Sequence, residues 1–160
     1  MKYLEMAMEK AVQLGADYAD IRIQKTTSES IYLQNFSVKE SNQNVLYGYG
    51  IRIMKDGAWG FAHSNIFTDE ALVKTVQKAF ETAKLSALVK NGAGLRLANE
   101  KSYDATYRTP FKIDPFNIPL KEKAELFMEI NRRMLNYKEI KKAVTFFNAQ
   151  KDEKLYASTL

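Results

Sequence analysis

Cysteine is absent from this 160-residue chain, and histidine occurs once, at His63. Without cysteine the chain forms no disulfide and offers no thiolate to a metal ion, a composition that fits a reducing compartment. A catalytic zinc site generally takes three protein ligands, most often histidines. A single histidine therefore disfavours such a site, and we predict no metal-binding residue in this chain.

Long hydrophobic runs are also missing, and no apolar stretch approaches the length that spans a membrane. The N-terminal residues 1–5 lack the basic start and apolar run of a signal peptide. We therefore expect a cytoplasmic protein without membrane contact. Hydrophobic residues make up 46% of the chain and aromatic residues 12%, which is enough for one domain with a real core.

The net charge of +5 does not come from one basic stripe, because Lys and Arg are mixed with Glu and Asp almost everywhere. A basic surface can attract nucleic acid, but the interspersed acids predict only weak, non-specific binding. The alternative to a nucleic-acid patch is the solvated end of a helix, where cations also suit the helix dipole. This choice concerns the densest basic stretch, Arg132, Arg133, Lys138, Lys141 and Lys142.

The strongest local signal is Asp56-Gly57, which separates two apolar runs within residues 48–65. An Asp-Gly pair in this setting favours a two-residue hairpin turn. The turn fixes the register, with Lys55 opposite Ala58 and Met54 opposite Trp59. The next expected pairs are Ile53 with Gly60, Arg52 with Phe61, and Ile51 with Ala62.

Large residues stand beside small ones on both faces of this hairpin, so we expect both faces to be covered. Trp59 should then be largely buried beside Met54 and Arg52. Gly48 and Gly50 lie two residues apart, where a helix or side chain can approach closely. A phosphate-binding role for these glycines is disfavoured, because no helix begins after Gly50.

The rest of the chain predicts an α+β domain, with about three helices covering a largely antiparallel sheet of about 5–7 strands. Apolar periodicity predicts helices over 3–14, 68–87 and 119–136, with Thr68 as an N-cap. Alternating patterns predict further strands over 16–26, 30–33, 37–41, 143–150 and 155–159, with a polar turn at 151–154. Residues from about 89 to 118 form an irregular connection. We expect this connection to be packed against the rest of the chain by apolar side chains, namely Tyr103, Tyr107, Phe111, Ile113 and Phe116.

Two carboxylate pairs are the remaining candidates for catalysis, Asp17 with Asp20 and Asp69 with Glu70. The first pair is explained by strand and loop polarity, and the second by charge complementation at a helix start. His63 shares a face with Trp59 and Phe61, which favours a packed or rim histidine over a ligand. We therefore predict no catalytic, cofactor-binding or metal-binding residue. The residues alone indicate a binding or scaffold domain.

Several ordered blocks resemble the TldD/PmbA family of zinc metallopeptidases, also called modulators of DNA gyrase. The most specific block is 48–65, above all Gly57–Ala62, which is more similar to the TldD arm than to the PmbA (TldE) arm. Two departures are Asn35-Phe36, where the family commonly has Asp-Gly, and His63, where Ser or Thr is usual. The other blocks are 15–22, 28–31, 107–110, 112–116 and 119–123.

The resemblance implies that residues 1–160 are the N-terminal domain of a longer TldD-like protein. The zinc motif HExxxH of the family lies in a C-terminal domain beyond this chain, so zinc is expected in the parent and not in this segment. The implied partners are a PmbA/TldE-like subunit or a second copy, which together enclose the active site, and the implied substrates are peptides or unfolded chains. The pattern also stops within a strand at Leu160, which we interpret as truncation.

Two alternatives remain open. The first is a stand-alone module that binds a peptide or protein, with extended peptide added as a strand at a sheet edge. The second is nucleic-acid binding, suggested by the charge of +5 and by the gyrase name. An HExxxH motif further along the reading frame would favour the peptidase, and salt-dependent DNA binding would favour the nucleic-acid-binding alternative.

Overall fold

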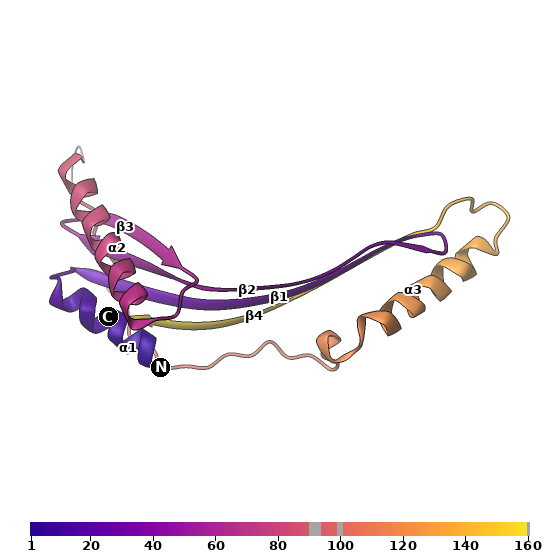
Figure 1. Cartoon of the computed structure of the whole chain (residues 1–160), viewed down its shortest axis with the longest axis horizontal. Helices are drawn as coiled ribbons and strands as arrows, with labels where there is room; N and C mark the ends of the chain where they lie inside the picture. The colour runs from indigo at the N-terminus through magenta and orange to yellow at the C-terminus, as the bar shows by residue number, and fades with distance from the viewer. Residues whose placement is uncertain (90–93, 99–100, 160) are drawn as a thin grey trace. The chain divides into compact units, whose positions relative to one another are not determined.

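The computed structural model describes residues 1–89, 94–98 and 101–159 and defines an α+β fold, as the sequence predicts (Figure 1). Its four strands form one sheet in the order β3-β2-β1-β4. The three helices and the sheet match the predicted class. The elements are α1 (Lys2–Gln13), β1 (Tyr18–Gln34), β2 (Ser37–Lys55), β3 (Ala58–Ser64), α2 (Asp69–Val89), the 3-10 turn η1 (Pro115–Asn117), α3 (Leu120–Leu135) and β4 (Val144–Ser158).

The described strands are fewer and longer than the predicted 5–7, because polar segments continue the ladder instead of ending it. β1 joins the expected strands 16–26 and 30–33, β2 joins 37–41 to the first strand of the hairpin, and β4 joins 143–150 and 155–159. The turn expected at 151–154 is therefore wrong, since these residues belong to β4. Backbone pairing with a neighbouring strand stabilises such polar stretches even where no apolar alternation marks them.

The chain divides into two compact units, and β1, β2 and β4 each supply residues to both. The first unit comprises Met1–Lys25, Leu46–Asp104 and Glu153–Leu160. The second unit comprises Thr26–Val45 and Ala105–Asp152.

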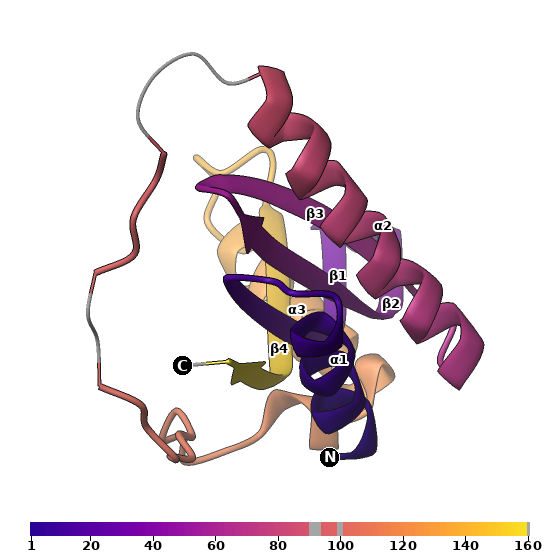
Figure 2. The same cartoon turned by 90° about the vertical axis from the view of Figure 1, so that its left-hand side faces the viewer.

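In the first unit, α1 and α2 cover the same face of the sheet (Figure 2). The core beneath them is built from alternate residues of β1 and β2, with Ile21, Ile51 and Ile53 fully buried. Gly60 of β3 lies directly under α2, where an added Cβ would be 2.0 Å from the carbonyl oxygen of Ala79. A side chain approaches Gly50 closely, as expected, because an added Cβ there would be 3.0 Å from the Phe61 ring; the close helix approach occurs at Gly60.

The predicted hairpin is confirmed residue for residue, with Lys55 opposite Ala58 and Arg52 opposite Phe61. Asp56 and Gly57 both have positive φ, 51° and 68°. That combination is what a type I′ turn requires. Asp17 stabilises the turn, because its carboxylate accepts a hydrogen bond of 2.6 Å from the Asp56 N–H.

Helix limits agree with the sequence to within two residues. The Thr68 hydroxyl caps α2 by accepting a 3.2 Å hydrogen bond from the Ala71 N–H. Gly15 follows α1 with φ of 80°, a conformation that suits glycine after a helix. None of the helices in the described part of the chain is long and apolar enough to cross a membrane.

In the second unit, polar side chains hold α3 against the sheet. Lys123 of α3 forms an ion pair with Glu29 of β1, and both side chains are almost fully buried. Asn131 lies two turns further along α3; it donates to the Asn35 carbonyl (2.9 Å) and accepts from the Thr145 hydroxyl (2.6 Å). The apolar side predicted for this helix is correspondingly only part-buried, and the buried α3 positions are Lys123 and Asn131.

The β1–β2 turn shows how Asn35-Phe36 can stand where the family commonly has Asp-Gly. Asn35 alone of the two takes positive φ, 55°. Its side-chain oxygen accepts from the Ala143 N–H (3.0 Å), and its own N–H donates to the Ala143 carbonyl (2.8 Å). Phe36 therefore does not need the left-handed conformation that a β-carbon disfavours.

The connection between α2 and α3 contains no helix or strand over 94–98 and 101–114. Leu95 donates to the Gly57 carbonyl (3.0 Å), which packs 94–98 against the hairpin turn. The expected packing of the aromatic residues is wrong, since Tyr103 and Tyr107 are 80% and 84% exposed and Phe111 and Ile113 are also exposed. Phe116 is half-buried, as part of η1.

Candidate functional site

The face of the first unit's sheet opposite α1 and α2, called the open face below, collects aromatic and arginine side chains. It consists of Tyr18, Asp20 and Arg22 of β1, Arg52 and Met54 of β2, Trp59, Phe61 and His63 of β3, and Tyr156 of β4. The expectation that both hairpin faces are covered is wrong within the described residues. Phe61 is 56% exposed, and half of the Arg52 side chain meets solvent.

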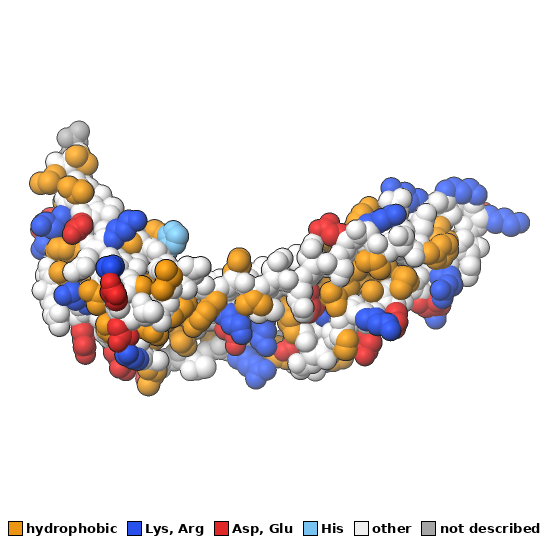
Figure 3. Space-filling view, viewed as in Figure 1, with side chains coloured by type: hydrophobic (Ala, Val, Ile, Leu, Met, Phe, Trp, Pro, Cys, Tyr) orange, Lys and Arg blue, Asp and Glu red, His pale blue; other side chains and the backbone are white. Residues whose placement is uncertain are grey.

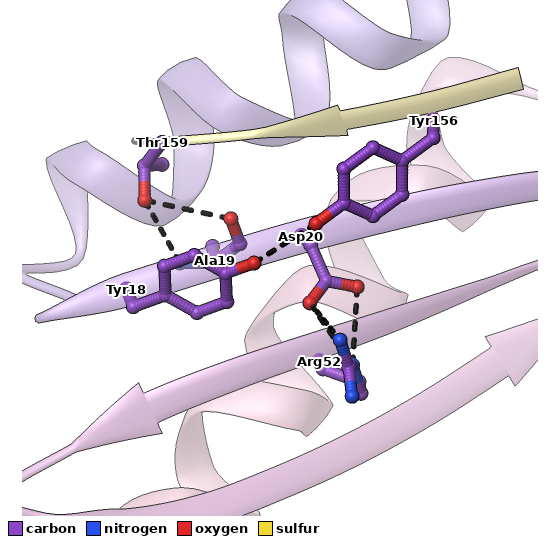
Figure 4. Close-up of polar contacts among 6 residues, drawn as sticks. All are labelled: Tyr18, Ala19, Asp20, Arg52, Tyr156 and Thr159. Atoms are coloured by element: carbon purple, nitrogen blue, oxygen red, sulfur yellow. Dashed lines mark hydrogen bonds and ion pairs between the residues drawn. The ribbon is translucent and has the colours of Figure 1, made fainter. Parts of the chain in front are cut away.

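Asp20 and Arg52 form the charged centre of the open face (Figure 4). Two guanidinium nitrogens of Arg52 donate to the Asp20 carboxylate, with Nε at 2.9 Å and Nη2 at 2.6 Å from Oδ2. This fork geometry is the strong, directional form of an arginine–carboxylate contact. The Asp20 side chain is only 3% exposed, so Arg52 is what satisfies a nearly buried charge.

Tyr18 and Tyr156 meet across the β1–β4 pair beside this ion pair (Figure 4). Their hydroxyl oxygens lie 3.0 Å apart, and Tyr18 is buried whereas Tyr156 is half exposed. Burial, together with the hydrogen bond to Tyr156 and the nearby Asp20 charge, raises the pKa of Tyr18. A tyrosine held neutral in this way is a hydrogen-bonding group and not a base at ordinary pH.

Trp59 lies over the side of the same cluster and is partly buried, beside Met54 and Arg52 as the hairpin register predicts. The Arg52 guanidinium is 5.3 Å from the Trp59 ring centre, and the Tyr18 ring meets it edge-on at 5.6 Å. Met54, its cross-strand partner, is buried. The cluster thus combines a cation–π contact with an ion pair on one arginine.

The other singled-out residues do not join this cluster as a catalytic set. The Asp17 carboxylate accepts a hydrogen bond from the hairpin turn, and the Asp69 carboxylate forms an ion pair with the Lys2 ammonium at 2.7 Å. Glu70 pairs with Lys74 one helical turn later. His63 is exposed at the rim of the open face, 5.8 Å from the Phe61 ring (Figure 3).

Among residues 1–89, 94–98 and 101–159, no three side chains of the metal-ligating types lie close enough to hold a metal ion. The donor set of the described chain thus does not fit the zinc that the family resemblance implies. We derive no chemical step through zinc in this domain. The open face presents aromatic surface, arginine donors and a buried carboxylate.

The first unit thus has α1 and α2 on one face of its sheet and aromatic and arginine side chains on the other face. The profile of PmbA/TldA metallopeptidase domain 1 matches residues 19–83, which contain β1, β2, β3 and most of α2. This match makes the chain similar to the first domain of the PmbA/TldD metallopeptidase family. The matched region also contains Tyr18's neighbours on the open face, Asp20, Arg52 and Trp59.

Two curated relatives and one solved structure extend the comparison. A metalloprotease of Methanocaldococcus jannaschii is 30% identical over 131 residues, covering 82% of this chain and 29% of the relative. The metalloprotease TldD homolog of Buchnera aphidicola is 27% identical over 127 residues, covering 79% and 25%. A candidate modulator of DNA gyrase from Bacteroides thetaiotaomicron shares the fold, with TM-score 0.77, 14% identity and coverage of 99% and 36%.

The chain matches less than a third of the length of these two curated relatives. Their names, metalloprotease and TldD homolog, describe the longer proteins.

Proposed function

We propose that this chain is the N-terminal, non-catalytic domain of a TldD-like zinc metallopeptidase that processes peptides and unfolded chains. The observation that carries the proposal is the match of residues 19–83 to the family's first domain. The chain as a whole matches only about a quarter of the length of each metalloprotease relative. One histidine and no cysteine support this proposal, because a catalytic zinc site generally takes three protein ligands. A cytoplasmic location is part of the same proposal.

In this role the domain shapes the enclosed active site and contacts a PmbA/TldE-like subunit. We assign the subunit contact to the open face. Trp, Tyr and Arg are the residue types that most often dominate binding energy at protein interfaces. Arg52, Trp59 and Tyr156 supply all three types there, and Phe61 adds 56% exposed aromatic surface.

Phe61→Ser tests that assignment, because it removes exposed apolar surface from the open face without touching the core under α1 and α2. We expect this substitution in the full-length parent to weaken co-purification with the PmbA/TldE-like subunit. Val12→Ser is the matched control, since Val12 is 62% exposed on α1. Equal binding by both variants would remove the open face from the interface while leaving the peptidase assignment intact.

A peptide-cleavage assay tests whether this chain is the non-catalytic part of the parent. The full-length parent should cleave unfolded peptide, lose this activity to a chelator and regain it with zinc. The 160-residue chain should not cleave the peptide under any of these conditions. Cleavage by the purified chain would place the chemistry within these residues.

The second candidate is a stand-alone module that binds peptide or protein without enzymatic activity. It is favoured by the same open face, which carries binding residue types without a catalytic set among the described residues. A reading frame that ends without an HExxxH motif would favour the module, and a frame containing that motif would favour the peptidase.

A further inference from the structure

The outer edge of β4 is a bare strand edge in the second unit, because β4 is the last strand in the sheet order. β1 and β4 are antiparallel: Asn35 bonds to Ala143 at one end of the pair, and Ala19 bonds to Thr159 at the other. The two bonded residues, Ala143 and Thr159, flank β4 directly and are both odd-numbered. Bonded and outward-facing positions alternate along an antiparallel strand. The backbone groups of Val144, Phe146, Asn148 and Gln150 therefore point away from β1.

The side chains of these same residues lie on the sheet face opposite α3. The intervening residues point to α3, since Phe147 packs against Phe127 and Thr145 bonds to Asn131. Phe146 is 67% exposed and Val144 is 47% exposed. Described residues form no backbone hydrogen bond to this edge.

The sequence of the edge lacks the devices that usually protect one. Natural edge strands carry charges, proline or bulges that prevent pairing with another chain. Residues 144–150, Val-Thr-Phe-Phe-Asn-Ala-Gln, contain no charge, no proline and no glycine. A run of β-favouring residues with these properties is suited to pairing with another strand.

The charges that flank this run are arranged symmetrically about Phe147. Lys142 precedes Phe147 by five residues, and Asp152 follows it by five. In an antiparallel pair of two identical strands centred on Phe147, Lys142 of one copy lies opposite Asp152 of the other. Both have the parity of the outward-facing positions, so they share a face, and the contact occurs twice because a two-fold interface repeats every contact.

We propose that the outer edge of β4 pairs with the same edge of a second copy of this chain, antiparallel and centred on Phe147. Phe146 then pairs with Asn148 of the other copy, and Val144 pairs with Gln150. Registers centred one residue away put Lys142 opposite the uncharged Gln150 or opposite the like-charged Lys154. The self-complementary charges therefore favour a second copy over an unrelated extended peptide. The pairing does not depend on the peptidase assignment.

Proline at Asn148 tests the edge, because the N–H of residue 148 points away from β1 and its loss leaves the ladder within the chain intact. Analytical ultracentrifugation of the 160-residue chain should show a concentration-dependent dimer. Asn148→Pro should be monomeric, whereas the matched Asn148→Thr should remain dimeric. A monomer at every concentration, or an open-ended polymer, would overturn the proposal. Capture of an extended peptide by a monomeric chain would overturn it as well.

Engineered cysteines test the register. The chain has no cysteine of its own, so every disulfide within or between chains must form between introduced residues. A mixture of Phe146→Cys and Asn148→Cys chains should form a disulfide under mild oxidation. Their α-carbons would be about 5.5 Å apart, within disulfide range. Neither variant should cross-link by itself, because identical positions lie diagonally at about 7–8 Å. Val12→Cys mixed with Asn148→Cys controls for random oxidation, and efficient cross-linking of either variant by itself would overturn the register.

Charge reversal gives a third readout that does not depend on proline or oxidation. Lys142→Glu should weaken the dimer roughly five- to tenfold, since it replaces two exposed attractions with repulsions. Adding Asp152→Lys to Lys142→Glu should restore most of the affinity. A double variant no tighter than the single one would contradict the assigned pairing. Failure here would leave the activity comparison of chain and parent unaffected.

Discussion

Lys123 of α3 and Glu29 of β1 form an ion pair whose side chains are only 6% and 3% exposed. Gln43 of β2 donates a second hydrogen bond to the same carboxylate, at 2.8 Å. The ring centres of Phe116 and Phe147 lie 5.9 and 5.4 Å from the Lys123 ammonium. A charge pair surrounded in this way depends on both partners, because either one left behind is a buried, unpaired charge.

We therefore predict that Lys123→Met destabilises the chain by about 3–5 kcal/mol, the usual cost of breaking a buried pair from one side. The double variant Glu29→Met/Lys123→Met should cost much less than the sum of the two single variants, because no charge is stranded. Denaturant melts of all four proteins measure this coupling. Additive losses would show that the pair is not the link between α3 and the sheet.

Gly60 is predicted to be the least replaceable glycine of the hairpin. Gly60→Ala places a Cβ 2.0 Å from the Ala79 carbonyl and 2.4 Å from the Ala83 nitrogen, so α2 must move. We expect a loss of about 1–3 kcal/mol or more, as for overpacked cores. Gly50→Ala is the matched control, because its nearest neighbour is the exposed Phe61 ring at 3.0 Å. Equal losses in thermal melts would contradict the close approach of α2.

Removal of Arg52 is predicted to cost more than neutralisation of its partner. Arg52→Met leaves the Asp20 carboxylate buried without its guanidinium, at a cost of about 1–3 kcal/mol. Asp20→Asn leaves an arginine that is half exposed and can turn to water. Urea melts of both variants and of their combination test this asymmetry. A larger loss for Asp20→Asn would contradict the assigned roles.

Tyr18 is predicted to make stability fall at high pH. Its pKa is raised above the ordinary value of 10.0, chiefly by burial and then by the Tyr156 hydrogen bond. Below pH 10 both folded and unfolded chains keep the proton, so stability is unaffected. As the pH rises above 10.0 the unfolded chain loses its proton first, so folding is weakened.

Tyr18→Phe removes this titration and leaves the other tyrosines in place. Denaturant melts at neutral pH and above pH 10.0 should show a smaller decline for Tyr18→Phe than for the unmodified chain. Tyr47→Phe is the control, since Tyr47 is 53% exposed. Parallel declines of the unmodified chain and Tyr18→Phe would exclude the proposed effect.

The sequence predicted the hairpin completely because its information is local. Asp56-Gly57 sets the turn, and the turn sets every cross-strand pair up to Tyr49 with Ser64. The helices were predicted within two residues for the same reason, since caps and apolar periodicity are local signals. Strand limits failed at 27–29 and 151–154, where polar residues are held by backbone pairing with a strand far away in sequence.

The candidate site was only half predictable. The hairpin register already put Arg52 beside Trp59, and both are on the open face. Asp20 was noted as a carboxylate, but its pairing with Arg52 spans 32 residues and the Tyr18–Tyr156 contact spans 138. No local pattern indicates such partners. The buried Lys123 was missed likewise, because an apolar stripe predicts burial of hydrophobic residues and Glu29 lies 94 residues away.

The most direct test of the central claim is a zinc and peptidase measurement on the 160-residue chain and its full-length parent, side by side. We predict about one zinc per parent molecule and chelator-sensitive cleavage of unfolded peptide, with neither in the isolated chain. Elemental analysis after dialysis and a fluorogenic peptide assay give both readouts on the same samples. Stoichiometric zinc or peptide cleavage in the isolated chain, or a parent without zinc, would contradict the assignment of this chain as a non-catalytic domain.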